Sequence, residues 1–151
     1  MPELKSEFLF TIRITVDHLH DVGETPFGTR QIDMLGDGSF EGPRLKVIVL
    51  GGMDQKIFRS DGAMNPNVRI ILKTDDDALI YMYYTGIRYG SPEVMQRIAD
   101  GETVDPSEYY LRNTPYFETS VEKYDWLNRI VSVGVGRRMP DHAEYDVFQI
   151  L

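Results

Sequence analysis

The sequence predicts an all-β protein, an antiparallel β-barrel of about eight to ten strands with one short helix. Three observations lead to this fold class. Apolar and polar residues alternate with a period of two along most of the chain, as they do in strands with one buried face. Turn residues recur at intervals of about 8 to 12 residues, and a single segment carries the start and stop signals of a helix. Closing the sheet into a barrel is the arrangement that removes unpaired strand edges.

The first half of the chain predicts four strands. Alternation is clearest after residue 7, where every second residue from Phe8 to Val16 is apolar. The string Gly36-Asp37-Gly38 predicts a hairpin turn between the second and third strands, and the pair Gly51-Gly52 separates the third from the fourth. The predicted strands are residues 8–16, 30–35, 39–50 and 55–59.

The second half predicts the helix and five further strands. Ser91 is in the position of an N-cap, Pro92 occupies the first helical position, and Gly101 supplies the C-terminal stop. The predicted strands are residues 68–74, 78–87, 108–118, 129–138 and 144–151.

Composition restricts the class of protein. A length of 151 residues is typical of one domain, so we expect a single domain over residues 1–151. No apolar run approaches the roughly 18 residues of a membrane helix, and the N-terminus lacks the pattern of a secretory signal, so we expect a soluble, cytoplasmic protein. The absence of cysteine excludes disulfides, thiolate metal sites and cysteine nucleophiles. A formal charge of −8 argues against a nucleic-acid partner, and the pair Arg137-Arg138 is interpreted as a solvated strand edge.

Known cofactor and metal motifs give no support for a bound group. His18, His20 and Glu24 match the core of a cupin metal motif, and alternate strand residues would project both imidazoles to one side. The flanking glycines are misplaced, however, and no second motif supplies a further histidine. The sequence also lacks a nucleophile elbow, a phosphate-binding glycine loop and a dinucleotide fingerprint. We therefore expect no metal and no cofactor.

Distinctive strings occur along nearly the whole chain, among them Asp21-Val22-Gly23-Glu24-Thr25-Pro26, Gly38-Ser39-Phe40-Glu41-Gly42-Pro43, Thr74-Asp75-Asp76-Asp77-Ala78 and Trp126-Leu127-Asn128-Arg129. By these strings and their order, the chain resembles domain-of-unknown-function family 3237, also called uncharacterised protein family 0311. The resemblance implies a β-barrel, in agreement with the strand pattern. It implies no particular reaction.

The resemblance also identifies two departures from the family pattern. Where the family usually has Asp-Trp after the double glycine, this chain has Asp54-Gln55, and where the family usually has Asp-Ala-Arg, it has Asn67-Val68-Arg69. An amide has no titratable proton near neutral pH. Any acid–base role common to the family would therefore fall on Asp54, or the chemistry differs here.

Charged and aromatic residues on or beside the predicted strands are the candidates for a site inside the barrel. Arginines there would orient a carboxylate, phenolate or enolate oxygen and stabilise its charge, and tyrosines would add hydroxyl donors and flat walls. We expect catalytic roles for Asp54 as a proton shuttle, Arg69 as an oxyanion stabiliser and Tyr110 as a positioning donor. Ligand contacts are expected from Arg30, Glu41, Asn67, Tyr81, Tyr83, Arg112 and Glu118. The alternative is that these residues form structural ion pairs and half-buried rings.

Two classes of function remain open from the sequence. The first is a cofactor-independent isomerase, cyclase or lyase that binds a small hydrophobic or aromatic oxygenated molecule in the barrel. The second is a non-catalytic barrel, which either binds a small molecule or serves as a structural oligomer. Residues 68–74 and 78–84 are apolar on both strand faces, which indicates either a lined cavity or a subunit interface. We therefore expect a homodimer or larger homo-oligomer.

Overall fold

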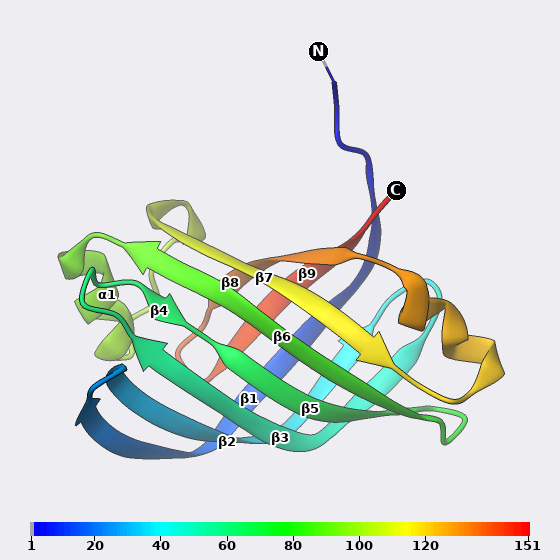
Figure 1. Ribbon diagram of the computed structural model, residues 1–151, viewed down its shortest axis with the longest axis horizontal. Helices are drawn as coiled ribbons and strands as arrows, with labels where there is room; N and C mark the ends of the chain where they lie inside the picture. The colour runs from blue at the N-terminus through cyan, green and yellow to red at the C-terminus, as the bar shows by residue number, and fades with distance from the viewer. Residues whose placement is uncertain (1) are drawn as a thin grey trace.

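Eight long antiparallel strands close into a barrel in the computed structural model (Figure 1), which describes residues 2–151 except the side chains of Phe40 and Glu41. Around the ring the order is β1, β2, β3, β5, β6, β7, β8 and β9, and β9 pairs back with β1. A ninth, two-residue strand, β4, bridges β3 and β6 at one end. The antiparallel barrel predicted from the sequence is confirmed.

The strands are β1 (Ser6–Thr25), β2 (Gly28–Glu41), β3 (Lys46–Phe58), β4 (Met64–Asn65), β5 (Asn67–Thr74), β6 (Leu79–Gly90), β7 (Tyr109–Glu118), β8 (Ser132–Arg138) and β9 (His142–Ile150). The predicted α-helix is α1 (Pro92–Ala99), and Ser91 caps it by accepting a hydrogen bond from the Val94 amide. Two 3-10 helices, η1 (Pro106–Glu108) and η2 (Glu122–Arg129), were not predicted. Over residues 2–151 no helix is long and apolar enough to span a bilayer.

The hairpin turn predicted at Gly36-Asp37-Gly38 is wrong, because β2 runs without interruption through these residues. The turn between β1 and β2 lies at Pro26-Phe27. The glycines at positions 36 and 38 serve close packing instead: a Cβ at Gly36 would lie 2.1 Å from a carboxylate oxygen of Asp17, and one at Gly38 would lie 2.2 Å from a β1 carbonyl. The turn between β2 and β3 lies at residues 42–45.

A bulge in β3 changes which residues face the barrel interior. Val49 pairs with Leu72 and Gly51 with Ile71, so Leu50 is the extra residue. Before the bulge the inward residues of β3 are odd-numbered, as Val49 is, and beyond it they are even-numbered. Gly51 takes a φ of 140°, which favours glycine. The strand therefore continues through Gly51-Gly52, where the sequence predicted a break.

Apolar side chains fill one half of the barrel. Successive rows of paired strands place Val49 beside Leu72, and Ile70 beside Met82. The core of this half consists of Phe10, Ile12, Leu45, Val47, Val49, Ile70, Leu72, Ile80, Met82, Phe117, Leu127 and Val147, all of them buried. The helix η2 covers this end, and α1 lies at the opposite end (Figure 1). Tyr124 and Lys123 of η2 both bond the Asp76 carboxylate in the turn between β5 and β6.

Candidate functional site

The other half of the barrel is lined by polar side chains. Asp54 pairs with Asp33 on one side and with Val68 on the other, and Val68 pairs with Tyr84, so these four residues share the inner face. Further along β5 towards η2, the next two residues on the same face are the apolar Ile70 and Leu72. A cavity of about 50 Å³ lies at the polar end. Its polar lining consists of Asp33, Asp54, Lys56, Tyr84, Arg88, Arg138 and Tyr145.

Asp54 is the acid with the most altered environment in this cavity. Burial raises the pKa of its carboxyl group to about 6, and the negative charge of Asp33 acts in the same direction. The backbone N–H of Asn67 donates to Asp54 Oδ1 at 3.0 Å, which opposes the rise. A carboxyl group with a pKa near 6 is mainly ionised at pH 7 and takes up a proton more readily than an ordinary aspartate, which suits proton transfer.

Asp33 and Lys56 form an ion pair beside Asp54. Asp33 Oδ2 lies 2.9 Å from Lys56 Nζ, and both side chains are largely buried. The second oxygen of Asp33, Oδ1, is buried without a hydrogen-bond partner among the described residues. One face of this carboxylate is therefore neutralised and the other can accept a hydrogen bond.

Two arginines reach the same cavity. Arg88 is only 6% exposed, and among the described residues no acceptor bonds its guanidinium Nε. Arg138 likewise has a buried Nη1 without an acceptor, while its backbone N–H donates to the Tyr109 hydroxyl at 2.7 Å. Burial lowers the pKa of Arg88, and the charge of Arg138 lowers it further. Among the described residues, no carboxylate forms an ion pair with either guanidinium group.

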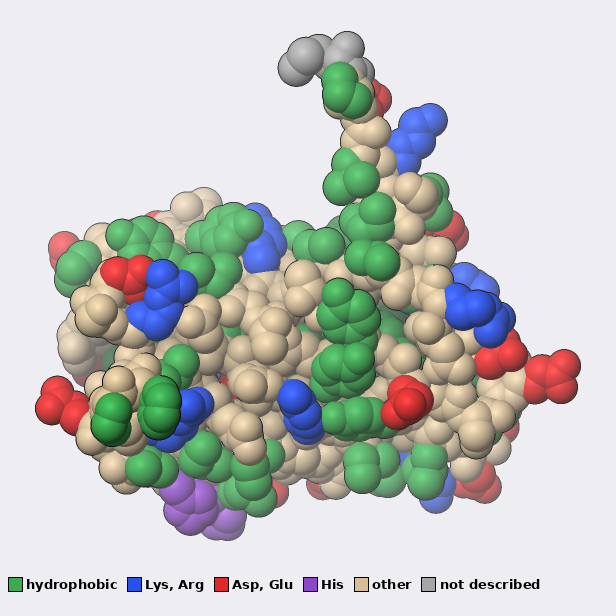
Figure 2. All heavy atoms as spheres, in the orientation of Figure 1, with side chains coloured by type: hydrophobic (Ala, Val, Ile, Leu, Met, Phe, Trp, Pro, Cys, Tyr) green, Lys and Arg blue, Asp and Glu red, His purple; other side chains and the backbone are tan. Residues whose placement is uncertain are grey.

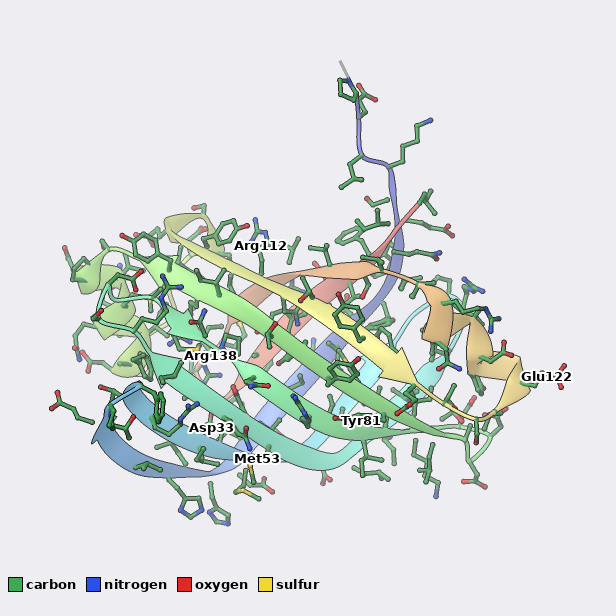
Figure 3. All side chains as sticks on the ribbon, viewed as in Figure 1. Asp33, Met53, Tyr81, Arg112, Glu122 and Arg138 are labelled. Carbon is green, nitrogen blue, oxygen red and sulfur yellow. The ribbon has the colours of Figure 1, made fainter. Side chains whose placement is uncertain are left out.

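Tyr84 and Tyr145 complete the polar wall. Their rings meet edge to face with centroids 5.3 Å apart. Burial raises the pKa of both hydroxyls, so both stay protonated and remain hydrogen-bond donors at neutral pH. Figure 3 shows Asp33 and Arg138 reaching this end of the barrel from β2 and β8, while Met53 of β3 lies on the outer side.

Of the predicted catalytic residues, the structure places Asp54 at the cavity and the other two outside it. Arg69 lies on the outer face of β5, donates to Asn67 Oδ1 at 2.8 Å and has its guanidinium 5.6 Å from the Tyr83 ring centre. Tyr110 is half exposed on the outside of β7, where Arg112 stacks over its ring at 4.6 Å. The expectation that these side chains project inward is corrected, because each lies in the outward phase of its strand.

The predicted ligand contacts are also mostly on the outside. Tyr81 and Tyr83 stack on each other with centroids 5.4 Å apart, and Tyr83 stacks on Tyr116 in the next strand. Arg30 donates to the Gln55 carbonyl at 2.8 Å, and Glu118 is exposed opposite Tyr81. The remaining predicted contacts on the outside are Asn67 and Arg112. The Glu41 side chain lies outside the described residues.

Sequence reasoning missed six cavity residues: Asp33, Lys56, Tyr84, Arg88, Arg138 and Tyr145. The signal for two of them was present in β6, where Ile80, Met82 and Tyr84 alternate in one phase that continues to Arg88. The two residues of the pair Arg137-Arg138 lie on opposite faces of β8. Arg137 forms ion pairs with Glu144 and Asp146 on the outer surface, and Arg138 faces the cavity. The histidines of the cupin-like string lie exposed on β1, and among residues 2–151 no cluster of potential metal ligands occurs.

Comparison with known proteins agrees with the strings found in the sequence. The model of a family described as protein of unknown function, DUF3237, matches residues 4–150. The chain belongs to this family. The UPF0311 protein of Rhodopseudomonas palustris is 33% identical over 151 residues, with 99% of each chain covered. The crystal structure of that protein aligns with this chain over 100% of both chains, with a TM-score of 0.94.

Two further structures extend the comparison. A protein of Acinetobacter baumannii described as β-barrel-like is 36% identical, with a TM-score of 0.86 over 100% of this chain and 98% of the other. A structure described as an enzyme from Penicillium herquei is 21% identical, with a TM-score of 0.74 over 100% of this chain and 98% of the other. The last similarity shows the fold alone.

Proposed function

We propose that this protein is a cofactor-independent enzyme that moves a proton on a small oxygenated molecule bound in the polar half of the barrel, as an isomerase, cyclase or lyase does. The observation that carries the proposal is Asp54, whose carboxyl group has a pKa of about 6 and faces a cavity lined by guanidinium and phenol donors. These are the two components of enolate chemistry: a base matched to neutral pH and donors for the oxyanion that forms.

The roles follow from charge and position. Ionised Asp54 removes a proton from carbon or oxygen of the ligand and returns it to another position. The Asp33–Lys56 ion pair and the two arginines form a positive surround for the oxygen on which negative charge develops, and Tyr84 and Tyr145 add neutral donors. The enzyme of Penicillium herquei supports the proposal only in that a barrel of this fold serves catalysis there.

Exchange of substrate hydrogen for solvent deuterium tests the proposal even while the product is unidentified. The protein is incubated in D2O with a panel of enolisable ketones, oxo acids and phenolic compounds, and deuterium incorporation is followed by NMR. We expect exchange with part of the panel, and Asp54→Asn to lower its rate by roughly 10²–10⁴-fold. The matched control is Asp75→Asn, at an exposed turn position, which leaves the rate unchanged. Equal exchange by wild type and Asp54→Asn would overturn the assignment.

The outer surface supports a second candidate, a structural role through self-association. Hydrophobic side chains form a band across the face of β3, β5, β6 and β7, as Figure 2 shows. The band includes the exposed residues Ile48, Leu50, Ile71, Leu79, Tyr83 and Tyr116. An apolar face of this kind is typical of interfaces, and we propose that a second copy of the chain covers it. Light scattering would show a dimer or larger assembly that Ile71→Glu dissociates, and a monomeric mass for the wild type would contradict this role.

A further inference from the structure

The charge of the cavity is opposite to that of the whole chain. The protein carries a formal charge of −8, yet the charged groups that line the cavity are three cations, Lys56, Arg88 and Arg138, and two acids, Asp33 and Asp54. Lys56 is neutralised by Asp33 at 2.9 Å. With Asp54 ionised the cavity keeps about one positive charge, and with Asp54 protonated it keeps two.

Neither arginine of the cavity has an ion-pair partner among the described residues. Arg88 is more than nine-tenths buried, its Nε has no acceptor among the described residues, and no carboxylate forms an ion pair with it. Among its charged neighbours, the like charge of Arg138 has the largest effect on the pKa of Arg88 and lowers it, whereas Asp54 acts in the opposite direction. Arg138 also has a buried Nη1 without an acceptor among the described residues. Buried charges in folded proteins are normally paired. Water could accept hydrogen bonds from both groups, but a neutral molecule would not offset their repulsion.

Asp33 presents the complementary group. Its Oδ1 is buried and has no donor among the described residues, although Oδ2 bonds Lys56. The cavity thus carries unused donors on β6 and β8 and an unused acceptor on β2. A ligand that satisfies all of them has an anionic group with two oxygens at one end and a hydroxyl group at the other.

We propose that the ligand of the barrel is a small hydroxy or enolisable oxo carboxylic acid, bound with its carboxylate between Arg88 and Arg138 and its hydroxyl or enol hydroxyl donating to Asp33. Guanidinium groups match a carboxylate in charge and geometry. This inference rests on the proposed function for its choice of site and extends it by naming the substrate class. The free volume of about 50 Å³ restricts the buried part of the ligand to a few heavy atoms.

Binding measurements test the inference independently of turnover. The probes are 2-hydroxy, 2-oxo and 3-oxo monocarboxylates of four to six carbons, each paired with its primary amide, and their affinities are measured by calorimetry. We expect carboxylates to bind more tightly than their amides. Arg138→Gln and Arg88→Gln should weaken this binding by roughly tenfold to a hundredfold, the loss of a charge-assisted hydrogen bond. Arg112→Gln removes a guanidinium from the outer surface and should leave binding unchanged.

Three results separate this inference from the proposed function. Asp54→Asn should retain carboxylate binding, because it removes a negative charge from the cavity, even where it abolishes deuterium exchange. The ligand class would be overturned if carboxylates bind no better than their amides, or if they bind Arg138→Gln as tightly as the wild type. Either result would leave the role proposed for Asp54 intact.

Asp33→Asn keeps the size of the side chain, and it should weaken the binding of hydroxy acids more than the binding of acids without the hydroxyl group. Equal weakening of the two would contradict the contact to Asp33. Arg138 is only partly buried, so its variant tests the site even where Arg88→Gln fails to fold.

Discussion

The two halves of the barrel interior are made by the same strands but have opposite chemistry. Towards η2 the rows contain side chains such as Leu72, Ile80 and Phe117, which are packed and apolar. One step further along the same strands, the rows contain Asp54, Tyr84 and Arg88, with a cavity between them. From this difference we infer that the first half supplies the stability on which the second half depends, because the polar half buries charges that cost free energy.

The largest effect is expected in the apolar half. Leu72 is fully buried, so Leu72→Ala should lower the free energy of unfolding by about 2–5 kcal/mol through lost burial and the cavity left behind. Leu19 is half exposed on β1 and is not part of the apolar band, and Leu19→Ala should change the free energy of unfolding by about 0.5 kcal/mol or less. Urea denaturation of the two variants measures both values. Similar losses in the two would mean that the apolar half does not carry the stability.

A smaller effect is expected from the pH dependence of stability. The folded state holds the Asp54 proton up to about pH 6, whereas an unfolded chain releases it near pH 4. Between these values the folded state binds more protons, so the free energy of unfolding falls as pH rises, by up to about 3 kcal/mol in total.

Asp54→Asn isolates this contribution. The amide can still accept the hydrogen bond from Asn67, so the variant should lack the decrease between pH 4 and pH 6 and be the more stable protein at pH 7. The histidines and the surface acids are present in both proteins. Their contributions to the pH dependence therefore cancel when the free energy of unfolding of one protein is subtracted from that of the other. Parallel stability curves from pH 4 to pH 7 would contradict a raised pKa for Asp54.

The smallest expected effect is a gain in stability when a buried charge is removed. Arg88→Met replaces a buried cation, whose Nε has no acceptor among the described residues, by an apolar side chain of similar length, and should raise the free energy of unfolding by about 1–2 kcal/mol. Arg13→Met, at a guanidinium 3.1 Å from Glu144 and 62% exposed, should change it by about 0.5 kcal/mol or less. Thermal unfolding compares the two. A loss above about 2 kcal/mol in Arg88→Met would show that the arginine is structural.

The sequence predicted the barrel because alternation and turn residues are local properties. It predicted α1 for the same reason, since Ser91, Pro92 and Gly101 are local signals. The error at residues 36–38 has a physical cause: glycines there permit close contacts with β1 inside one long strand, and the sequence alone does not distinguish that use from a turn.

The site was predicted only in part, because which face of a strand is inside depends on contacts between distant residues. Asp54 was identified, but the bulge after Val49 that turns it inward is not visible as a change in pattern. Tyr81 and Tyr83 were chosen over Tyr84, although all three belong to an alternating strand that is apolar on both faces. The position of Arg88 and Arg138 at one cavity follows from closure of the ring, which brings β6 and β8 around it.

The titration of Asp54 tests the central claim, that the polar half of the barrel is a site prepared for proton transfer. The chemical shift of its side-chain carboxyl carbon is followed by NMR in protein labelled with carbon-13 at aspartate, and Asp54→Asn assigns the signal. The structure predicts an inflection at about pH 6. An inflection near pH 4, as for an exposed aspartate, would contradict the claim.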